Sequence, residues 1–326
     1  MTAAAPLPTE AAAGAISASG RDDVLRGIGF MCLSVLVFAT MNVVVKWQSS
    51  TYPVGDLVFF RSVFALVPCA VLIHRSGGLA TLRTARPLGH AVRSGVWLAS
   101  MVCTFLSYHL LPLAEAVSIG FSAPLFLTAL SGPVLGERVG TVRWAAVLAG
   151  FAGVLIMLRP GGDFLEWGAV FALGNAVFYA LGMLAVRELS RSGETSSSIV
   201  FFQTLLAAIV ATAALPFYWV TPSLADAAIM ASLGLGGGVG TYWMTEAFRH
   251  APASTVAPFN YTSMIWATLF GFVIWGELPT ALTIAGSTVV IGSGLFILRH
   301  ETRTKRRTAA PAAPPSSVIA RRATPS

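Results

Sequence analysis

Residues 112–140 read PLAEAVSIGFSAPLFLTALSGPVLGERVG, and residues 252–280 read PASTVAPFNYTSMIWATLFGFVIWGELPT. Each stretch is apolar, ends in a Gly-Glu pair, and precedes a second apolar run that closes on Leu-Arg. A constant offset of 140 residues aligns 112–159 with 252–299 without gaps. This regularity predicts two copies of one unit. The identical pairs are Pro112 with Pro252, Thr128 with Thr268, Gly136–Glu137 with Gly276–Glu277, Ala145 with Ala285, Leu155 with Leu295, and Leu158–Arg159 with Leu298–Arg299.

The composition of the whole chain indicates a membrane protein. Of its 326 residues, 55% are hydrophobic and only 11% are charged, and the mean hydropathy is +0.74. Soluble domains carry about 25% charged residues, more than twice this share. Apolar runs long enough to cross a hydrocarbon core of about 30 Å recur along almost the whole length. The alternating pattern of a membrane β-barrel is not evident, so the sequence predicts an all-α integral membrane protein.

Ten apolar segments divide into two sets of five, joined by short gaps that carry turn residues. We expect a first repeat over 27–159 and a second over 160–299. The flanking stretches, 1–26 and 300–326, are rich in Ala, Pro and Ser or in basic residues, and we expect both to be disordered. The segments lie near 27–47, 55–73, 91–110, 114–135, 141–158, 167–186, 197–220, 225–247, 253–275 and 280–298.

The placement of the basic residues predicts the orientation and argues against a nucleic-acid partner. The net charge is +7, but most arginines lie between apolar segments or in the tail. If the amino terminus is cytoplasmic, 18 of the 21 Lys and Arg residues fall inside. Only Lys46 and Arg159 then fall outside, and Arg61 lies within the second segment. The positive-inside rule therefore predicts a multi-pass membrane protein with both termini in the cytoplasm.

Five spans per repeat would insert the second copy upside down relative to the first. Inverted repeats of this kind are typical of secondary transporters, which bind substrate near the midplane between the halves. Two copies of opposite orientation can exchange roles, so that outward-open and inward-open states have similar free energies. A scaffold or receptor has no comparable use for such symmetry.

Charged residues inside the spans are candidates for the substrate site, because a charge in the bilayer tends to face a cavity or a partner. Arg61 lies too deep to reach the membrane surface; it either forms a structural ion pair or binds an anionic or carbonyl group of the substrate. Lys46 ends the first span and either extends to the surface or faces the cavity. Glu137 and Glu277 fit a structural role, because negative charge stabilises the start of the helix that follows each.

Amide and aromatic residues complete the candidate site. Amides within apolar spans need hydrogen-bonding partners, and aromatic rings can wall a pocket for a planar ligand, although any one ring can equally be a packing or interfacial residue. Pro124 and Pro258 free backbone groups in their spans, and we expect them to act as hinges. The candidate amides are Asn42, Asn175 and Asn260, and the candidate rings are Trp97, Tyr108, Phe121, Tyr179, Tyr261 and Trp266.

Several features fit packing better than chemistry. The glycine-rich run 234–240 follows no strand and lacks the Lys-Ser/Thr of a phosphate loop, so it predicts close helix approach. Cys32, Cys69 and Cys103 lie inside apolar segments in no metal-ligand spacing. No nucleophile, histidine cluster or carboxylate pair suggests an enzyme. We therefore expect no catalytic residue, no metal and no cofactor.

The motifs resemble a known family. Two five-span halves, each with an apolar Gly-Glu hinge and a Gly-rich last span ending in Arg, are similar to the EamA family of the drug/metabolite transporter superfamily. FFRSVFAL around Arg61, LPLAEAVSIGFSAPLF and APASTVAPFNYTSMIW resemble the branch that contains S-adenosylmethionine importers and riboflavin importers. Asn260 stands where that branch has an acidic residue; if this position contacts the substrate, the change weakens any carry-over of specificity. The resemblance implies a ten-helix bundle in a bacterial inner membrane. The first four helices of each half would line the central cavity, and the fifth and tenth would pack outside it.

The sequence thus predicts a secondary transporter of a small polar or amphipathic metabolite, such as riboflavin, S-adenosylmethionine or an amino acid. Its expected partners are that solute and membrane lipids. The sequence does not decide between a monomer and a homodimer. The alternative is a membrane scaffold or small-molecule sensor, which accounts for the helices but not for the antiparallel duplication.

Overall fold

A computed structural model describes residues 10–75, 78, 82–137, 139–158 and 167–309, and these residues form helices and short connections without a strand. The all-α prediction is confirmed for this part of the chain. The helices of the first half are α1 (Glu10–Gln48), α2 (Val54–Arg75), α3 (Pro87–Leu110), α4 (Leu113–Gly120), α5 (Ala123–Leu135) and α6 (Thr141–Leu158). Those of the second half are α7 (Trp167–Arg191), α8 (Ser196–Ala214), the 3-10 turn η2 (Leu215–Phe217), α9 (Leu224–His250), α10 (Ala253–Val256), the 3-10 turn η3 (Ala257–Tyr261), α11 (Thr262–Trp275) and α12 (Ala281–Ala309).

Eight helical stretches in the described residues are long and apolar enough to cross a membrane. The chain is therefore a multi-pass membrane protein. Two of the ten predicted segments fall outside these eight. One is α3, whose buried face carries polar residues such as His90 and Arg93. The other is the segment from α10 to α11, which is divided into short helices.

Two segments are broken at repeat-related places, as the proline positions predict. The fourth is interrupted at Phe121 and Ser122, and Pro124 opens α5 in the first turn, where its missing N–H costs nothing. The ninth passes through η3, which Pro258 opens in the same way.

Both Gly-Glu hinges end a helix in the same conformation. Gly136 has φ 68° and Gly276 has φ 69°, in the left-handed region that glycine adopts without strain. The amide of Glu137 donates to the carbonyl of Ser131, and the amide of Glu277 donates to the carbonyl of Gly271, each six residues back. This is the Schellman arrangement that commonly ends helices.

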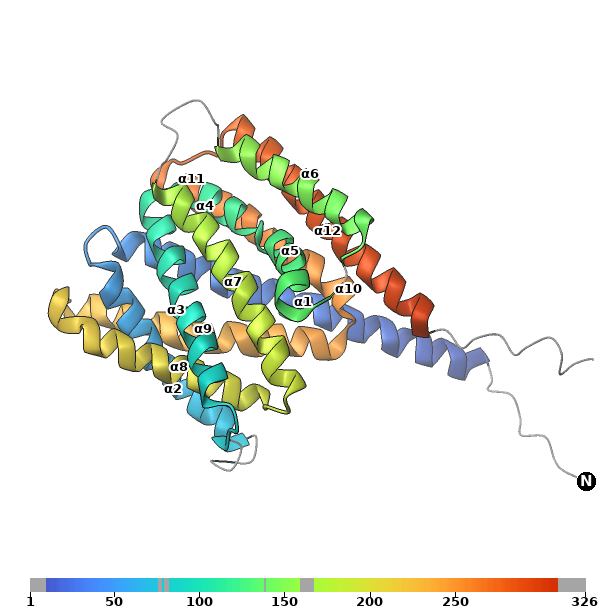
Figure 1. Cartoon of the computed structure of the whole chain (residues 1–326), viewed down its shortest axis with the longest axis horizontal. Coiled ribbons are helices and arrows are strands. Elements are labelled where there is room, and N and C mark those ends of the chain that lie inside the picture. Colours follow the sequence, from blue (N-terminus) through green and yellow to red (C-terminus); the bar gives the residue numbers. More distant parts are fainter. Residues whose placement is uncertain (1–9, 76–77, 79–81, 138, 159–166, 310–326) are drawn as a thin grey trace, which may run out of the picture.

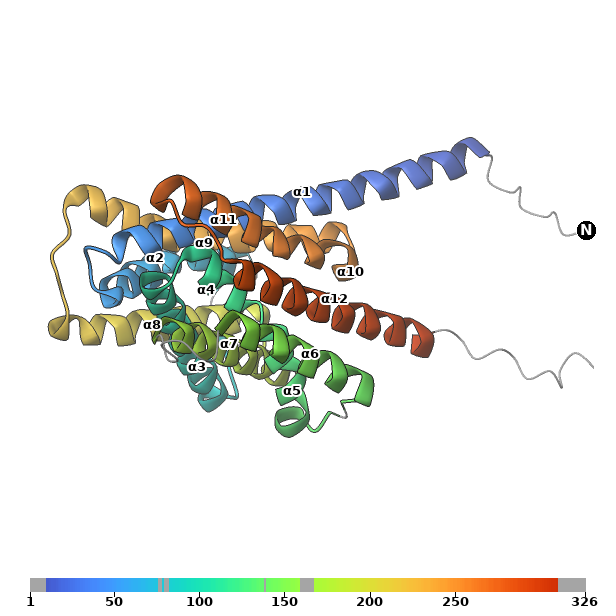
Figure 2. The same ribbon diagram turned by 90° about the horizontal axis from the view of Figure 1, so that it is seen from above.

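Helices of the two halves interleave in the bundle (Figures 1 and 2). α3 packs along α7, α1 packs along α9, and α2 packs against both α8 and α9. α6 and α12 pair with one another at one edge of the bundle. The predicted close helix approach at the glycine run is confirmed: a Cβ on Gly234 would lie 2.5 Å from the backbone nitrogen of Ala65, so α9 and α2 meet with almost no side chain between them.

The terminal helices are longer than the sequence boundaries suggest. α1 begins at Glu10 rather than near residue 27, and α12 continues to Ala309 rather than ending near residue 299. Alanine, arginine and lysine are strong helix formers, so residues 10–26 and 300–309 form helix although they are not long apolar runs. Both helices project from the same end of the bundle (Figure 2). The predicted disorder at 1–9 and 310–326 lies outside the described residues.

Candidate functional site

Two adjoining cavities lie inside the bundle. The larger has a volume of about 510 Å³ and the smaller about 270 Å³. We call them the outer chamber and the inner chamber. Their walls share residues of α1, α3 and α7, so the two cavities lie on either side of the same side chains. The shared residues are Phe38, Asn42, Tyr108, Asn175 and Tyr179.

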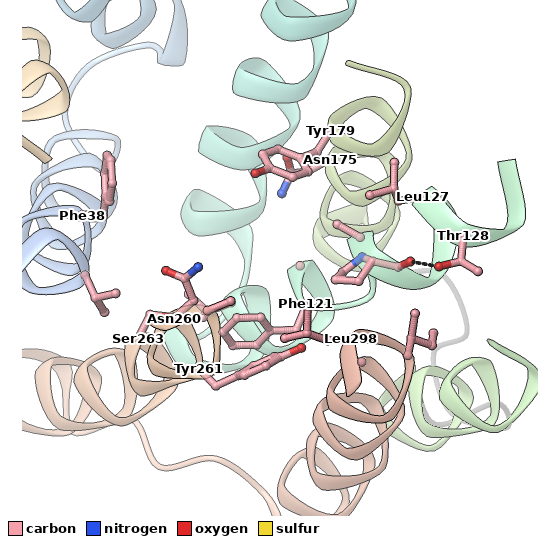
Figure 3. A pocket seen from close by; sticks show the side chains of 18 of the residues that line it. Phe38, Phe121, Leu127, Thr128, Asn175, Tyr179, Asn260, Tyr261, Ser263 and Leu298 are labelled. Carbon is pink, nitrogen blue, oxygen red and sulfur yellow. Dashed lines mark hydrogen bonds between the residues drawn. The ribbon is translucent and has the colours of Figure 1, made fainter. Parts of the chain in front are cut away.

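The broken helices meet at the outer chamber. Phe121, at the break between α4 and α5, contacts Tyr261 at the end of η3, with ring centroids 4.9 Å apart. Figure 3 shows Asn260 and Tyr261 on one wall, and Asn175 and Tyr179 across from them on α7. Pro124 also lines this chamber, and its carbonyl accepts a hydrogen bond from the Thr128 hydroxyl at 2.9 Å. The two helix breaks thus bring polar and aromatic groups to the same space.

One expectation about the walls is wrong. The family resemblance implied that the last helix of each half packs outside the cavity, yet α12 lines the outer chamber with Gly294, Ile297 and Leu298. Gly294 explains the close approach, because a Cβ there would lie 2.5 Å from the hydroxyl oxygen of Tyr261.

The three candidate amides all line the cavities, but their bonding differs. Asn175 accepts a hydrogen bond from the Ser100 hydroxyl at 2.7 Å, which fixes its orientation. The side chains of Asn42 and Asn260 make no hydrogen bond to another described residue. Their donors and acceptors are therefore available to a solute or to water in the cavity.

Arg61 lines the inner chamber among aromatic rings. Its guanidinium carbon lies 5.5 Å from the ring centroid of Trp97 and 5.6 Å from that of Phe105. Tyr108 lines the same chamber. Among the described residues no carboxylate pairs with Arg61, and none lines the inner chamber. The structural ion pair considered for Arg61 is therefore absent from the described part of the chain.

Arg93 is a buried cation that the sequence reasoning assigned to a cytoplasmic segment. α3 begins at Pro87, so Arg93 lies well inside the helix and is only 7% exposed. Its guanidinium carbon lies 5.6 Å from the ring centroid of Trp97, the same ring that Arg61 contacts. Its Nε has no hydrogen-bond partner among the described residues. A polar stripe at helical spacing (His90, Arg93, Ser94, Trp97 and Ser100) is the sequence signal that could have located it.

Lys46 does not line either chamber; it forms an ion pair at one end of the bundle. Its Nζ donates to both carboxylate oxygens of Glu277, at 2.7 and 2.9 Å, and to the Leu111 carbonyl at 2.7 Å. Glu277 also accepts from the backbone amide of Leu113 at 3.1 Å. One ion pair thus joins the ends of α1 and α11 to the junction between α3 and α4.

The repeat-related Glu137 forms its ion pairs at the opposite end. It accepts from Arg191 at 2.9 Å and lies 3.8 Å from Arg187, both at the end of α7. Glu137 and Arg187 also line the outer chamber, together with Arg143. The outer chamber therefore extends to the end of the bundle from which the termini project.

The remaining candidates lie away from the cavities. Trp266 does not line either chamber and stacks on Phe270, with centroids 5.8 Å apart. Pro258 lies in η3, beside Asn260 but not in the chamber wall. Glu246 and Arg249, one turn apart on α9, form an ion pair at 2.7 Å. In the described residues, His, Cys, Asp and Glu form no group able to hold a metal ion.

A polar cluster joins the two halves where α3 and α8 begin and α7 ends. Glu194, between α7 and α8, accepts from the Thr84 hydroxyl at 2.7 Å and from Ser198 at 3.2 Å, and lies 3.1 Å from His90 Nε2. The Thr84 bond, and then the His90 and Ser198 contacts, hold the pKa of Glu194 below its usual value.

Comparison with known proteins now identifies the class. The EamA-like transporter family matches residues 25–159 and again residues 166–299. The chain belongs to the EamA-like transporter family. The two matches correspond to the two repeats read from the sequence.

Several relatives that match this EamA-like protein over most of their length are named as transporters. A riboflavin transporter of Rhizobium johnstonii is 28% identical, over 87% of this chain and 94% of its own. An S-adenosylmethionine uptake transporter of Rickettsia bellii is 28% identical, and the match covers 85% of this chain and 94% of that protein. A pseudopaline exporter of Pseudomonas aeruginosa is 30% identical, and the match covers 85% of this chain and 98% of that protein. The EamA-like chain is accordingly a membrane transporter.

A solved crystal structure has the same fold. It superposes with a TM-score of 0.58 at 21% identity, and the match covers 89% of this chain and 99% of that one.

Proposed function

We propose that this transporter moves a small polar or amphipathic metabolite across the bacterial inner membrane by alternating access. Ten spans form two inverted five-helix repeats, and both termini are cytoplasmic. α1 to α6 make the first five spans and α7 to α12 the second five, with α4–α5 and α10–α11 each acting as one broken span. The solute binds in the outer and inner chambers between the halves.

The pairing of helices supports the inverted repeat. In the repeat, α3 corresponds to α9 and α7 corresponds to α1. The α3–α7 pair therefore corresponds to the α9–α1 pair, and both pairs are in contact. The α5–α7 pair likewise corresponds to the α11–α1 pair, and both of these pairs also pack together. α2 with α8 and α6 with α12 map onto themselves. A pseudo-twofold axis in the membrane plane accounts for all of these relations.

The observation that carries the mechanism is the difference between the two ends of the cavity. At one end the Lys46–Glu277 pair also binds the α3–α4 junction through Leu111 and Leu113. At the other end the outer chamber reaches Glu137 and Arg187. Closure at the first end and access at the second correspond to an inward-facing state.

The opposite state follows from the repeat. In the opposite state, the α9–α10 junction would approach the Glu137 ion pairs, as the α3–α4 junction approaches the Lys46–Glu277 pair here. The contact between the α3–α4 junction and the Lys46–Glu277 pair would then open. Asn42, Asn175 and Asn260 hydrogen-bond the solute, and Tyr261 with Phe121 stacks on it at the meeting point of the broken helices.

The experiment is solute flux into proteoliposomes that contain the purified full chain. The probes are riboflavin, S-adenosylmethionine, tryptophan and tyrosine, chosen because the relatives are named for riboflavin and S-adenosylmethionine and because aromatic rings line the cavity. We expect saturable uptake of at least one probe above protein-free liposomes. Flux equal to protein-free liposomes for every probe would favour the alternative of a scaffold or sensor.

A further inference from the structure

We propose that Arg61 binds a carboxylate of the transported solute within the inner chamber. The inference rests on the proposed function and goes further, because it gives the solute a chemical class. It is carried by the charge balance of the inner chamber, by the surroundings of Arg61 and by a difference between the two repeats.

Among the residues that the structure describes, the wall of the inner chamber contains one cation, Arg61, and no anion. Of the described residues that line it, only Arg61 is permanently charged, and the others are apolar, aromatic, amide or hydroxyl side chains. A guanidinium removed from bulk water needs an opposite charge or a full set of hydrogen-bond acceptors. The described residues supply Arg61 with neither, so its planar row of donors faces the cavity without a protein partner.

The surrounding rings orient the guanidinium but leave its edge free. Trp97 and Phe105 lie 5.5 and 5.6 Å from it, the distance range of cation–π contacts. A ring offers a face to the cation and no acceptor for its N–H groups. A carboxylate matches that edge with two parallel hydrogen bonds and neutralises a single positive charge. The rings of Phe38, Tyr108 and Tyr179 are positioned to pack on a flat group attached to the carboxylate.

The two repeats differ at this position. Residues 58–62 read VFFRS and residues 200–204 read VFFQT, so Arg61 on α2 corresponds to Gln203 on α8. α2 and α8 pack against one another as repeat-related partners. Because α8 forms with the neutral Gln203, the helix does not require a charge at this place. The guanidinium of Arg61 is therefore a feature of the cavity rather than of the packing.

Arg93 acts on the same site as a positioning residue. It does not line either chamber, but its guanidinium contacts Trp97, the ring that also contacts Arg61. Two cations at one indole make the neighbourhood strongly positive, which favours an anionic ligand and disfavours a cationic one.

The first test compares ligands of equal shape and different charge on the wild-type chain. The probes are indole-3-acetate, benzoate and nicotinate, each paired with its amide, and tryptamine as a cation. Thermal stabilisation in detergent and calorimetric titration report binding. We expect at least one acid to bind about 10-fold or more tightly than its amide, since bonds to charged groups exceed neutral ones by this order, and tryptamine not to bind.

Two results would overturn the proposal. One is equal binding of every acid and its amide, and the other is the absence of binding by all three acids up to their solubility limits. Neither result requires a variant, so misfolding cannot obscure the outcome.

The second test uses Arg61→Gln, the residue that the other repeat carries at this position, with Arg61→Lys and the matched control Arg75→Gln. Arg75 is an exposed arginine at the end of the same helix. We expect Arg61→Gln to remove the preference for acid over amide, Arg61→Lys to retain part of it, and Arg75→Gln to retain all of it. Retention of the full preference in Arg61→Gln would show that another group binds the anion.

The outcome also separates this inference from the proposed function. Flux of a neutral probe such as riboflavin, with no acid preference, would refute the carboxylate site and leave transport intact. Acid-selective binding without any flux would support the site and refute transport.

Discussion

Lys46 and Glu277 illustrate what single residues can and cannot reveal before the fold is known. Both stood out in the sequence as charges at span ends, but each had an interpretation of its own. The fold brings them together across 231 residues and adds the Leu111 carbonyl and the Leu113 amide. Arg61 and the three asparagines could be located from composition alone, since a polar residue in an apolar span is conspicuous. Composition alone does not locate Arg93, because other arginines lie in the gaps between spans; only its helical spacing with His90, Trp97 and Ser100 indicates a place inside the bundle.

Reversing charges at the Lys46–Glu277 pair tests its role in closing one end of the cavity. Lys46→Glu or Glu277→Lys leaves two like charges at 10% and 26% side-chain exposure, so either change should slow solute exchange in proteoliposomes and lower Tm. The double swap restores the ion pair but not the backbone bonds, and we expect it to recover part of the loss. A double variant as impaired as the worse single one would contradict a direct interaction.

Glu194 provides a pH-dependent prediction at residue scale. Because its pKa is depressed below 4.5 in the folded chain, its stabilising contribution is complete above the unfolded value and is lost as the pH falls through the folded one. Glu194→Gln should therefore lower Tm near pH 7, and the difference from wild type should shrink below about pH 4.5. A Tm difference that is constant from pH 7 to pH 3.5 would show that the carboxylate charge contributes nothing there.

At the scale of elements, the breaks between α4 and α5 and within the ninth segment locate the cavity. Proline predicted both breaks, because it removes an amide donor and fixes φ. The pairing of α6 with α12 depends instead on small residues: a Cβ on Gly153 would lie 2.8 Å from the Gly286 carbonyl oxygen and 2.9 Å from Val289 Cβ. The Gly-rich last spans are visible in the sequence, but which helices they meet, and that α12 also reaches the cavity, follows only from the three-dimensional arrangement.

Gly153→Ala should separate α6 from α12. The added methyl meets backbone and a β-branched carbon that cannot move aside, so we expect a loss of about 1–3 kcal/mol in stability. Gly292→Ala on α12 is the matched control, since a Cβ there meets nothing within 4 Å. It should be neutral or stabilise by up to about 1 kcal/mol through helix propensity. Thermal unfolding in detergent measures both, and equal Tm values for the two variants would contradict the packing argument.

At the scale of the whole molecule, the sequence predicted the duplication because both halves carry a Gly-Glu hinge at a constant offset of 140 residues. Family matches at residues 25–159 and 166–299 agree with it. Hydropathy alone is a weaker guide: α3 carries polar residues on a buried face, and the ninth segment is divided into short helices, so neither is a long and uniformly apolar helix. Their place in the bundle depends on partners that a window of sequence does not contain.

Cysteine accessibility tests the inverted arrangement. Ser50, after α1, and Ser192, after α7, are exposed positions that follow the first helix of each repeat. In a chain with Cys32, Cys69 and Cys103 replaced, we expect an impermeant maleimide to label Ser50→Cys in intact cells and Ser192→Cys only after permeabilisation. Labelling of both from the same side would mean parallel repeats and would remove the basis for alternating access.

The unequal exposure of the two acidic hinges has a consequence for the medium in which the protein works. Lys46 and Glu277 are 10% and 26% exposed, whereas Arg187 and Arg191 are 44% and 54% exposed beside Glu137 at 33%. Dissolved salt screens exposed charges much more than buried ones, and its screening length falls to about 8 Å at physiological ionic strength. Added electrolyte therefore weakens the Glu137 hinge first, and under the proposed alternating access it would shift the population of the two facing states from the side where the termini lie.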